Sequence, residues 1–276
     1  MKQHLFPAIG QMAVGTALIL SAATQSTAQV NAPSIGIARL GDATVRTLYG
    51  LPANVVVDSH VLGEFDAASF SDHAGLLSKN GHILLVRPNF AAVGEYASNE
   101  PQPLLNVDGG TDSAIAWLPG TGSLLHWSSG AFVLTTVNGL DRSLTVTSVW
   151  VQTPNSAGLL LADTYGSVFE AAVDLNSGNL SSLRALPGMH GHAFRQGSFL
   201  LYSDATGLQI AADNGAGVLR TIKLAASDLS FQHISNNWVL VNSLSTGQSW
   251  ALQLSSTVLN ISEIPAPSGN AQEVSK

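Results

Sequence analysis

Short apolar runs alternate with polar turns along most of the chain from Ile35 onward. The clearest example is Gly158–Asp174, GLLLADTYGSVFEAAVD, in which apolar runs at Leu159–Leu161 and Val168–Val173 flank the polar turn Asp163–Gly166. Short apolar runs bounded by Gly, Asn, Asp, Ser and Pro are typical of β-strands joined by tight turns. Helix signals are nearly absent after Ile35, so the pattern predicts an all-β domain.

The predicted strands fall into an N-terminal set and five units of four strands. The N-terminal set is Ile35–Leu40, Thr44–Tyr49 and Asn54–Asp58, with the first two strands turned at Gly41-Asp42. The first two units are Ala67–Phe70, Gly75–Ser78, His82–Arg87 and Leu104–Val107, with Asn89–Pro103 as an insertion, then Ser113–Pro119, Ser123–Ser128, Ala131–Val137 and Ser143–Val146. The last three units are Ser148–Thr153, Gly158–Asp163, Ser167–Val173 and Ser182–Leu186; His192–Arg195, Ser198–Ser203, Gly207–Ala211 and Val218–Leu224; and Leu229–Ile234, Trp238–Asn242, Ser249–Leu254 and Val258–Ile264.

The units recur at a regular spacing. The polar end of the second strand falls at Asp163, Asp204 and Ser243, at intervals of 41 and 39 residues, and Ser128 gives an interval of 35. Four strands in a period of about 40–45 residues indicate a β-propeller, in which each small sheet buries its faces against its neighbours. Five units and the N-terminal set predict six blades of four antiparallel strands. The alternatives are a five-bladed ring with Ile35–Asp58 added outside it, and a large sandwich or barrel.

One segment also resembles a known family. LLLADTYGSVFEAAVD is similar to the repeat of bacterial NHL-like β-propellers, in which an apolar run reaches Ala-Asp, a short turn follows, and a second apolar run ends in Asp. FLLYSDATGLQIAAD in the fourth unit is a second copy, and the chain lacks the basic residue that the family often carries after the turn. The resemblance implies a propeller fold and a tendency toward binding roles, without a particular activity.

The N-terminus has the order of features expected of a secretory signal peptide. Lys2 and His4 give a weakly basic start, Ile9–Ala23 is mostly apolar, and Ser26-Thr27-Ala28 supplies small residues for cleavage after Ala28. The alternative is an uncleaved N-terminal anchor. A cleaved leader predicts a secreted or periplasmic protein with no membrane span after its removal. The predicted organisation is a signal peptide at 1–28, a linker at 29–34, one propeller domain at 35–266 and a disordered C-terminal tail at 267–276.

Composition narrows the possible partners. The chain is 45% hydrophobic and 11% charged, which is too apolar for a disordered protein. Its formal net charge is −7 and its Lys and Arg residues form no basic block, which argues against a nucleic-acid partner. The chain contains no cysteine, so disulfides, thiol catalysis and Cys-based metal sites are excluded.

The candidate chemistry consists of acidic and His side chains in predicted loops. In a propeller, the loop entering each innermost strand lies near the mouth of the central channel. The predicted units place Asp66, Asp108, Asp112, His190, His192 and Asp228 in such loops. Of these, His190, His192, Asp112 and Asp228 are candidate ligands of a divalent cation, with His190 and His192 on one face of a strand. The competing interpretation is that the Asp residues cap turns and that the His pair binds nothing.

Two other sets of residues have structural interpretations. Asp163 and Asp204 recur at the same place in two units, which favours a role in stabilising turns over catalysis. The five tryptophans fall within predicted strands, where they are expected to fill space between blades. They are Trp117, Trp127, Trp150, Trp238 and Trp250.

The first functional hypothesis is therefore an exported, non-catalytic binding scaffold that needs no cofactor and docks a protein segment or a glycan on one face of the ring. One alternative is a metal-dependent hydrolase or lyase, like some lactonase propellers, with a divalent cation at the channel mouth. Another is a passive subunit of an envelope assembly. Neither a Gly-x-Ser-x-Gly motif nor a phosphate-binding Gly-rich motif occurs in the sequence.

Overall fold

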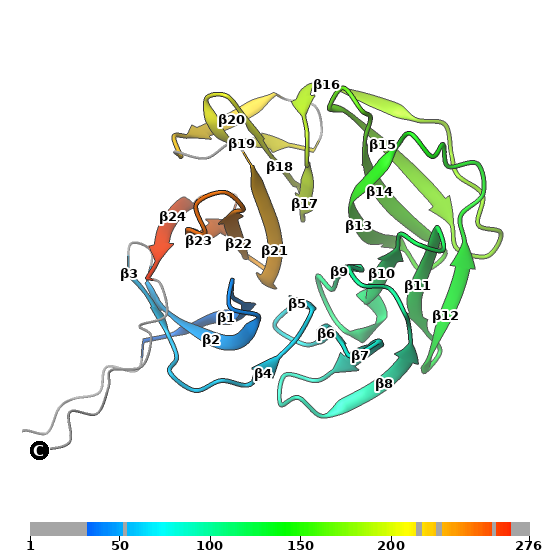
Figure 1. The fold of residues 1–276 in the computed structure, drawn as a ribbon. Coiled ribbons are helices and arrows are strands. Elements are labelled where there is room, and N and C mark those ends of the chain that lie inside the picture. Colours follow the sequence, from blue (N-terminus) through cyan, green and yellow to red (C-terminus); the bar gives the residue numbers. More distant parts are fainter. Residues whose placement is uncertain (1–31, 52–53, 214–216, 225–227, 256–257, 266–276) are drawn as a thin grey trace, which may run out of the picture. The chain divides into compact units, whose positions relative to one another are not determined.

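The computed structural model describes residues 32–51, 54–213, 217–224, 228–255 and 258–265. These residues form six antiparallel sheets that follow one another around a ring (Figure 1). The fold is a six-bladed β-propeller, as the repeat predicted. The predicted signal peptide 1–28, the tail 267–276 and residues 29–31 of the linker lie outside the described residues.

The blades are numbered in chain order. Blade 1 holds β1 (Ser34–Arg39), β2 (Thr44–Leu51), β3 (Asn54–Val57) and β4 (Gly63–Glu64); blade 2 holds β5 (Ala67–Phe70), β6 (Gly75–Lys79), β7 (His82–Val86) and β8 (Ala92–Ala97); blade 3 holds β9 (Leu104–Asn106), β10 (Ile115–Leu118), β11 (Ser123–Ser128) and β12 (Ala131–Thr136). Blade 4 holds β13 (Thr145–Thr153), β14 (Ser156–Ala162), β15 (Ser167–Asp174) and β16 (Arg184–His190); blade 5 holds β17 (Phe194–Gln196), β18 (Phe199–Asp204), β19 (Gly207–Ala212) and β20 (Val218–Ile222); blade 6 holds β21 (Leu229–Ser235), β22 (Trp238–Ser243), β23 (Ser249–Leu254) and β24 (Leu259–Ile264).

The hydrophobic core lies between the blades. Six apolar clusters occupy the six interfaces, so each blade buries both faces against its neighbours. Burial of one leucine side chain contributes about 2 kcal/mol, which makes these contacts the main source of stability. The five tryptophans lie in five different clusters, as expected for residues that fill space between blades.

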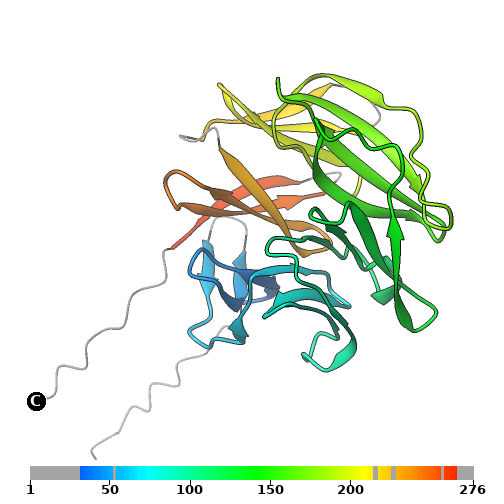
Figure 2. The ribbon, with the colours of Figure 1, turned by 45° about the vertical axis from the view of Figure 1, so that its right-hand side comes forward.

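The ring closes where blade 1 packs against blade 6. Figures 1 and 2 both show β1–β4 beside β21–β24. Ile35, Leu48 and Val55 of blade 1 share one buried cluster with Leu240 and Ile264 of blade 6. The first and last parts of the described chain are therefore held together by apolar contacts between two complete sheets.

Blade 1 differs from the other blades in its layers and direction. Both β3 and β4 pair with β2, so this blade has three layers where the others have four. Its innermost strand also runs opposite to its neighbours: Arg39, at the end of β1, donates a hydrogen bond of 2.5 Å from Nε to the carbonyl of Phe65, just before β5 begins. Each layer of an antiparallel sheet reverses the direction of the chain. With three layers, the chain must therefore start blade 1 at the opposite end in order to leave it where β5 begins.

The structure corrects the predicted strand grouping in two units. Leu104–Val107 and Ser143–Val146 do not close the first and second units; β9 and β13 begin the next blades instead. The predicted insertion Asn89–Pro103 contains β8, the outermost strand of blade 2. An outermost strand packs on few neighbours. Strand β8 therefore lacks the continuous apolar run that indicates a strand in the sequence.

The repeat itself is confirmed once the grouping is corrected. The second strands of blades 2 to 6 end at Lys79, Leu118, Ala162, Asp204 and Ser243, at intervals of 39, 44, 42 and 39 residues. Ser128, used in the predicted spacing, ends the third strand of blade 3 and is not equivalent to the others.

Asp163 and Asp204 hold turns, as the repetition predicted. Oδ1 of Asp163 accepts hydrogen bonds from the backbone amides of Tyr165 (2.8 Å) and Ser167 (2.7 Å). Oδ1 of Asp204 accepts bonds from the amide (2.7 Å) and hydroxyl (2.6 Å) of Thr206. The hydrogen bonds from Thr206 lower the pKa of Asp204 by favouring its charged form.

Replacing Asp204 with alanine should lower the melting temperature by roughly 2–4 °C, because the turn between β18 and β19 loses its local acceptor. Thermal unfolding followed by circular dichroism measures this shift. Asp72→Ala is the matched control, since Asp72 is an exposed aspartate outside the strands. An equal shift in the two variants would contradict the proposed role of the Asp204 side chain.

Candidate functional site

A cavity of about 450 Å³ lies at one end of the central channel, and all six blades contribute to its wall. Blade 6 supplies the largest share, from β21 and from the turn between β22 and β23. The lining residues are Arg39, Leu40, Gly41, Asp66, Ala67, Ala68, Pro103, Leu104, Leu105, Asn106, Thr147, Ser148, Val149, Phe194, Ser230, Phe231, Gln232, Asn242, Ser243, Leu244, Gly247 and Ser249.

Most polar side chains in this wall are neutral. They are the amides of Asn106, Gln232 and Asn242 and the hydroxyls of Thr147, Ser148, Ser230, Ser243 and Ser249. The two charged residues have partners within the fold. Arg39 donates a hydrogen bond to the Phe65 carbonyl, and Oδ2 of Asp66 accepts one of 3.2 Å from the backbone N–H of Asn80. The cavity therefore presents hydrogen-bonding groups with little net charge.

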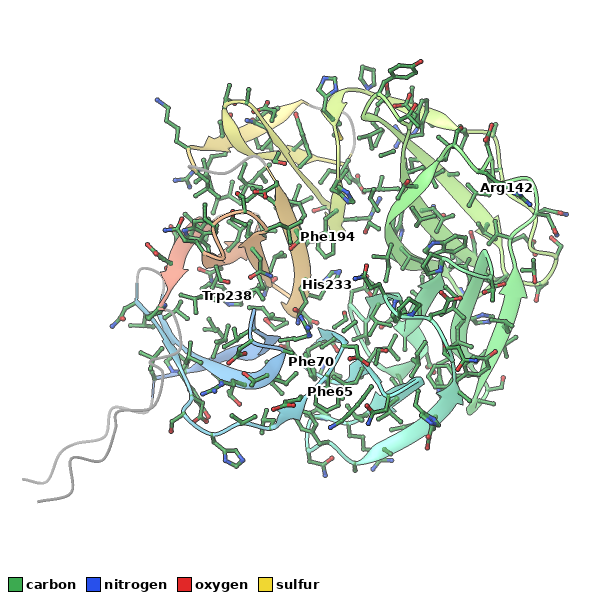
Figure 3. The ribbon with its side chains drawn as sticks, viewed as in Figure 1. Phe65, Phe70, Arg142, Phe194, His233 and Trp238 are labelled. Atoms are coloured by element: carbon green, nitrogen blue, oxygen red, sulfur yellow. The ribbon has the colours of Figure 1, made fainter. Side chains whose placement is uncertain are left out.

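One side of the cavity is aromatic. The rings of Phe194 and Phe231 are stacked, with centroids 5.7 Å apart and an angle of 26° between their planes. Phe194 is buried, and it lies near the centre of the ring in Figure 3. Phe231 is half-buried, so part of its ring remains available to a bound molecule.

A buried polar pair lies deeper between the innermost strands. Nδ2 of Asn106 lies 2.6 Å from Nε2 of His233, and both residues are almost fully buried. The His233 ring also contacts Phe194, with centroids 4.7 Å apart, and Figure 3 shows the two rings together. Burial lowers the pKa of His233 to about 3, so its imidazole is neutral at physiological pH. Oδ1 of Asn106 is buried and without a hydrogen-bond partner in the described part of the chain.

The candidate metal ligands are not brought together at this cavity. His190 ends β16 and is exposed, as is His192 in the following loop. Asp112 lies exposed in the short 3₁₀ helix Thr111–Ser113, and Oδ1 of Asp228 accepts bonds from Ser243 (3.2 Å) and Ser245 (2.9 Å). Within the described ranges, no three His, Cys, Asp or Glu side chains lie close enough together to hold a metal ion.

The observed assignment of strands to blades explains why some of the predicted loop residues do not line the cavity. Asp66 precedes an innermost strand and lines the cavity as predicted. Asp108 and Asp112 follow the innermost strand β9, so they lie beyond its far end and not at the mouth. Partial burial raises the pKa of Asp108, against a smaller opposing effect of hydrogen bonding and of the Arg195 charge.

A charged cluster between blades 4 and 5 was missed by sequence reasoning. Arg195 pairs with Asp213, and its Nη1 lies 3.4 Å from Oε1 of Glu170, which also pairs with Arg184. The Arg195 guanidinium lies 4.6 Å from the ring centre of Trp150. These partners come from separate strands with no common spacing in the sequence, and each charge in the cluster has an opposite charge beside it.

Comparison with known proteins finds no family for the chain. No protein-family model and no curated protein matches the chain, so the NHL-like resemblance stays a prediction. The β-propeller domain of Doa1 is 14% identical, with a TM-score of 0.44, over 83% of this chain and 90% of that one. AztD of Citrobacter koseri is 16% identical, with a TM-score of 0.42, over 86% and 72%. Hsv2p of Kluyveromyces lactis is 11% identical, with a TM-score of 0.40, over 80% of each chain.

The likeness to these structures is too distant to carry an argument about function. The structure adds one finding about membranes: among the residues it describes, no helix has the length and apolar character needed to cross a bilayer.

Proposed function

We propose that the protein is an exported, non-catalytic binding module that takes the end of a neutral glycan into the cavity at the channel mouth. The observation that carries this proposal is the composition of the cavity wall, which combines neutral amides and hydroxyls with the half-buried ring of Phe231. Export is supported by the leader pattern of residues 1–28, with cleavage after Ala28.

The chemistry of the wall suits a saccharide. Sugar hydroxyls are uncharged and both donate and accept hydrogen bonds, as do the serine and threonine hydroxyls of the wall. The apolar face of a sugar ring packs well on an aromatic ring such as Phe231. A charged ligand would find fewer partners of opposite charge, because the wall holds one cationic residue, Arg39, and one anionic residue, Asp66.

The shape of the site favours a chain end over a segment that passes through the ring. The cavity volume lies within the range of about 300–1,000 Å³ that is usual for small-ligand sites. Deeper in the ring, the buried Asn106–His233 pair joins β9 of blade 3 to β21 of blade 6 and so narrows the channel. One or two terminal sugar units therefore fit the site better than a continuous polymer.

The Phe231→Ala variant should bind its glycan at least 10-fold more weakly, because the ring supplies the apolar face of the site. A printed array of neutral glycans identifies the probe, and titration calorimetry measures its affinity. Phe199→Ala is the matched control: Phe199 packs against the same apolar cluster as Phe231 but does not line the cavity. Equal losses in the two variants, or binding of peptides and of no glycan, would contradict the proposal.

A further inference from the structure

Blade 1 ends in a strand edge that pairs with no other strand among the described residues. The other five blades have a fourth layer, whereas β3 and β4 share the third and last layer of blade 1. Strand β3, Asn54-Val55-Val56-Val57, therefore presents an unpaired edge among the described strands. An open edge offers backbone donors and acceptors to another strand.

The hydrogen bonds of β2 show which groups of β3 point outward. The amide of Gly50 donates to the carbonyl of Pro33, so Gly50 faces the β1 side of its strand. Gly50 is opposite Val55, and Leu48 is opposite Val57. In an antiparallel pair, residues alternate between bonding to the partner and facing away from it. The backbone N–H and C=O groups of Val55 and Val57 consequently face the open edge.

The other outermost strands carry charged residues or are covered by a loop, and both features discourage pairing with another strand. Strands β8, β16, β20 and β24 carry Glu95, Arg184, Arg220 and Glu263, which discourage edge pairing. At β12, the loop after β15 covers the strand end, where Thr135 donates to the Leu175 carbonyl at 2.8 Å. Strand β3 has neither a charged residue nor a proline.

Exposed apolar side chains accompany this edge. Val56 is 51% exposed and Leu51 is 62% exposed. Leu51 pairs with Asn54, and Asn54 and Val56 are two residues apart on one strand, so Leu51 and Val56 lie on the same face of the sheet. A strand added at this edge would cover part of both side chains.

We infer that β3 pairs antiparallel with β3 of a second copy of this chain. The edge is self-complementary. A two-fold axis at Val56 places Val55 of each copy opposite Val57 of the other. The backbone groups of Val55 and Val57 face outward in both copies, so they can bond to one another. The pairing forms four backbone hydrogen bonds and brings the two Val56 side chains together. This isologous contact closes on itself and yields a dimer.

Sedimentation equilibrium of the purified full chain tests this inference. The contact is short, so we expect the average mass to rise from one chain toward two between about 1 and 300 µM. Val56→Lys should remove this rise, because it places two like charges side by side at the two-fold axis. Val133→Lys is the matched control, since Val133 is similarly exposed, at 41%, on the outermost strand β12.

A second variant tests the backbone separately from the side chain. Val57→Pro removes an outward-facing N–H and no bond within blade 1, so it should also abolish the dimer while circular dichroism shows a folded protein. Wild-type protein that stays monomeric up to 300 µM would overturn the inference. A dimer that persists in folded Val56→Lys and Val57→Pro variants would also overturn it.

Discussion

Replacing Gly36 with alanine should destabilise the protein by roughly 3 kcal/mol or more. Gly36 lies in β1 at the closure of the ring and has a φ of +143°, a conformation that residues with a side chain rarely adopt. A Cβ atom at this position would lie 2.1 Å from the carbonyl oxygen of Ile234 in β21. Because that oxygen belongs to the backbone, β1 and β21 would have to separate.

Chemical denaturation of the wild type and the variant measures the change in unfolding free energy. Gly41→Ala is the control, because a Cβ atom at Gly41 meets no other atom within 4 Å. We expect this control to remain within about 1 kcal/mol of the wild type. A Gly36→Ala variant as stable as the Gly41→Ala variant would show that β1 does not pack this closely against β21.

Acidification from pH 7 to pH 4 should cost about 3 kcal/mol of stability through His233 alone. The pKa of His233 is about 3 in the folded protein, against an ordinary value of 6.5. The unfolded chain therefore takes up a proton at this residue as the pH falls below about 6.5, while the folded protein does not. The contribution of neutral His233 is complete above pH 6.5 and is lost progressively as the pH falls toward 3.

Urea unfolding at pH 7 and pH 4 measures this loss. A His233→Gln variant cannot take up the proton, so its stability should fall by about 3 kcal/mol less than that of the wild type over the same interval. Contributions from the other titrating groups are common to both proteins. One of these groups is His126, whose pKa is also lowered by burial. Equal losses in the two proteins would mean that His233 is accessible to protons in the folded state.

The sequence predicted the propeller because its middle strands are apolar and end in repeated turns. Asp163 and Asp204 mark equivalent strand ends, and both were correctly interpreted as turn residues. The outermost strand β8 and the innermost strand β9 were misplaced. Strand β8 is mostly exposed or half-buried and β9 has three residues, so neither has the apolar pattern of a central strand.

The cavity could not be predicted in the same way. Its serine, threonine and amide side chains match no motif, and they converge only because six blades bring their innermost strands to one axis. Asn106 and His233 are 127 residues apart in the sequence. The candidates predicted from the sequence were acidic and His residues in loops. Of these, Asp66 lines the cavity, whereas Asp228 accepts hydrogen bonds from two nearby serines.

The central claim is that a neutral glycan end binds at the channel mouth, and hydrogen–deuterium exchange with a glycan selected on the array tests it most directly. Bound glycan should slow exchange in 104–106, 147–149, 230–232 and 242–249, the backbone segments that surround the cavity. Exchange in the outermost strands of blades 2 to 5 should stay unchanged. Unaltered exchange around the cavity at saturating glycan, or protection confined to those outermost strands, would contradict the claim.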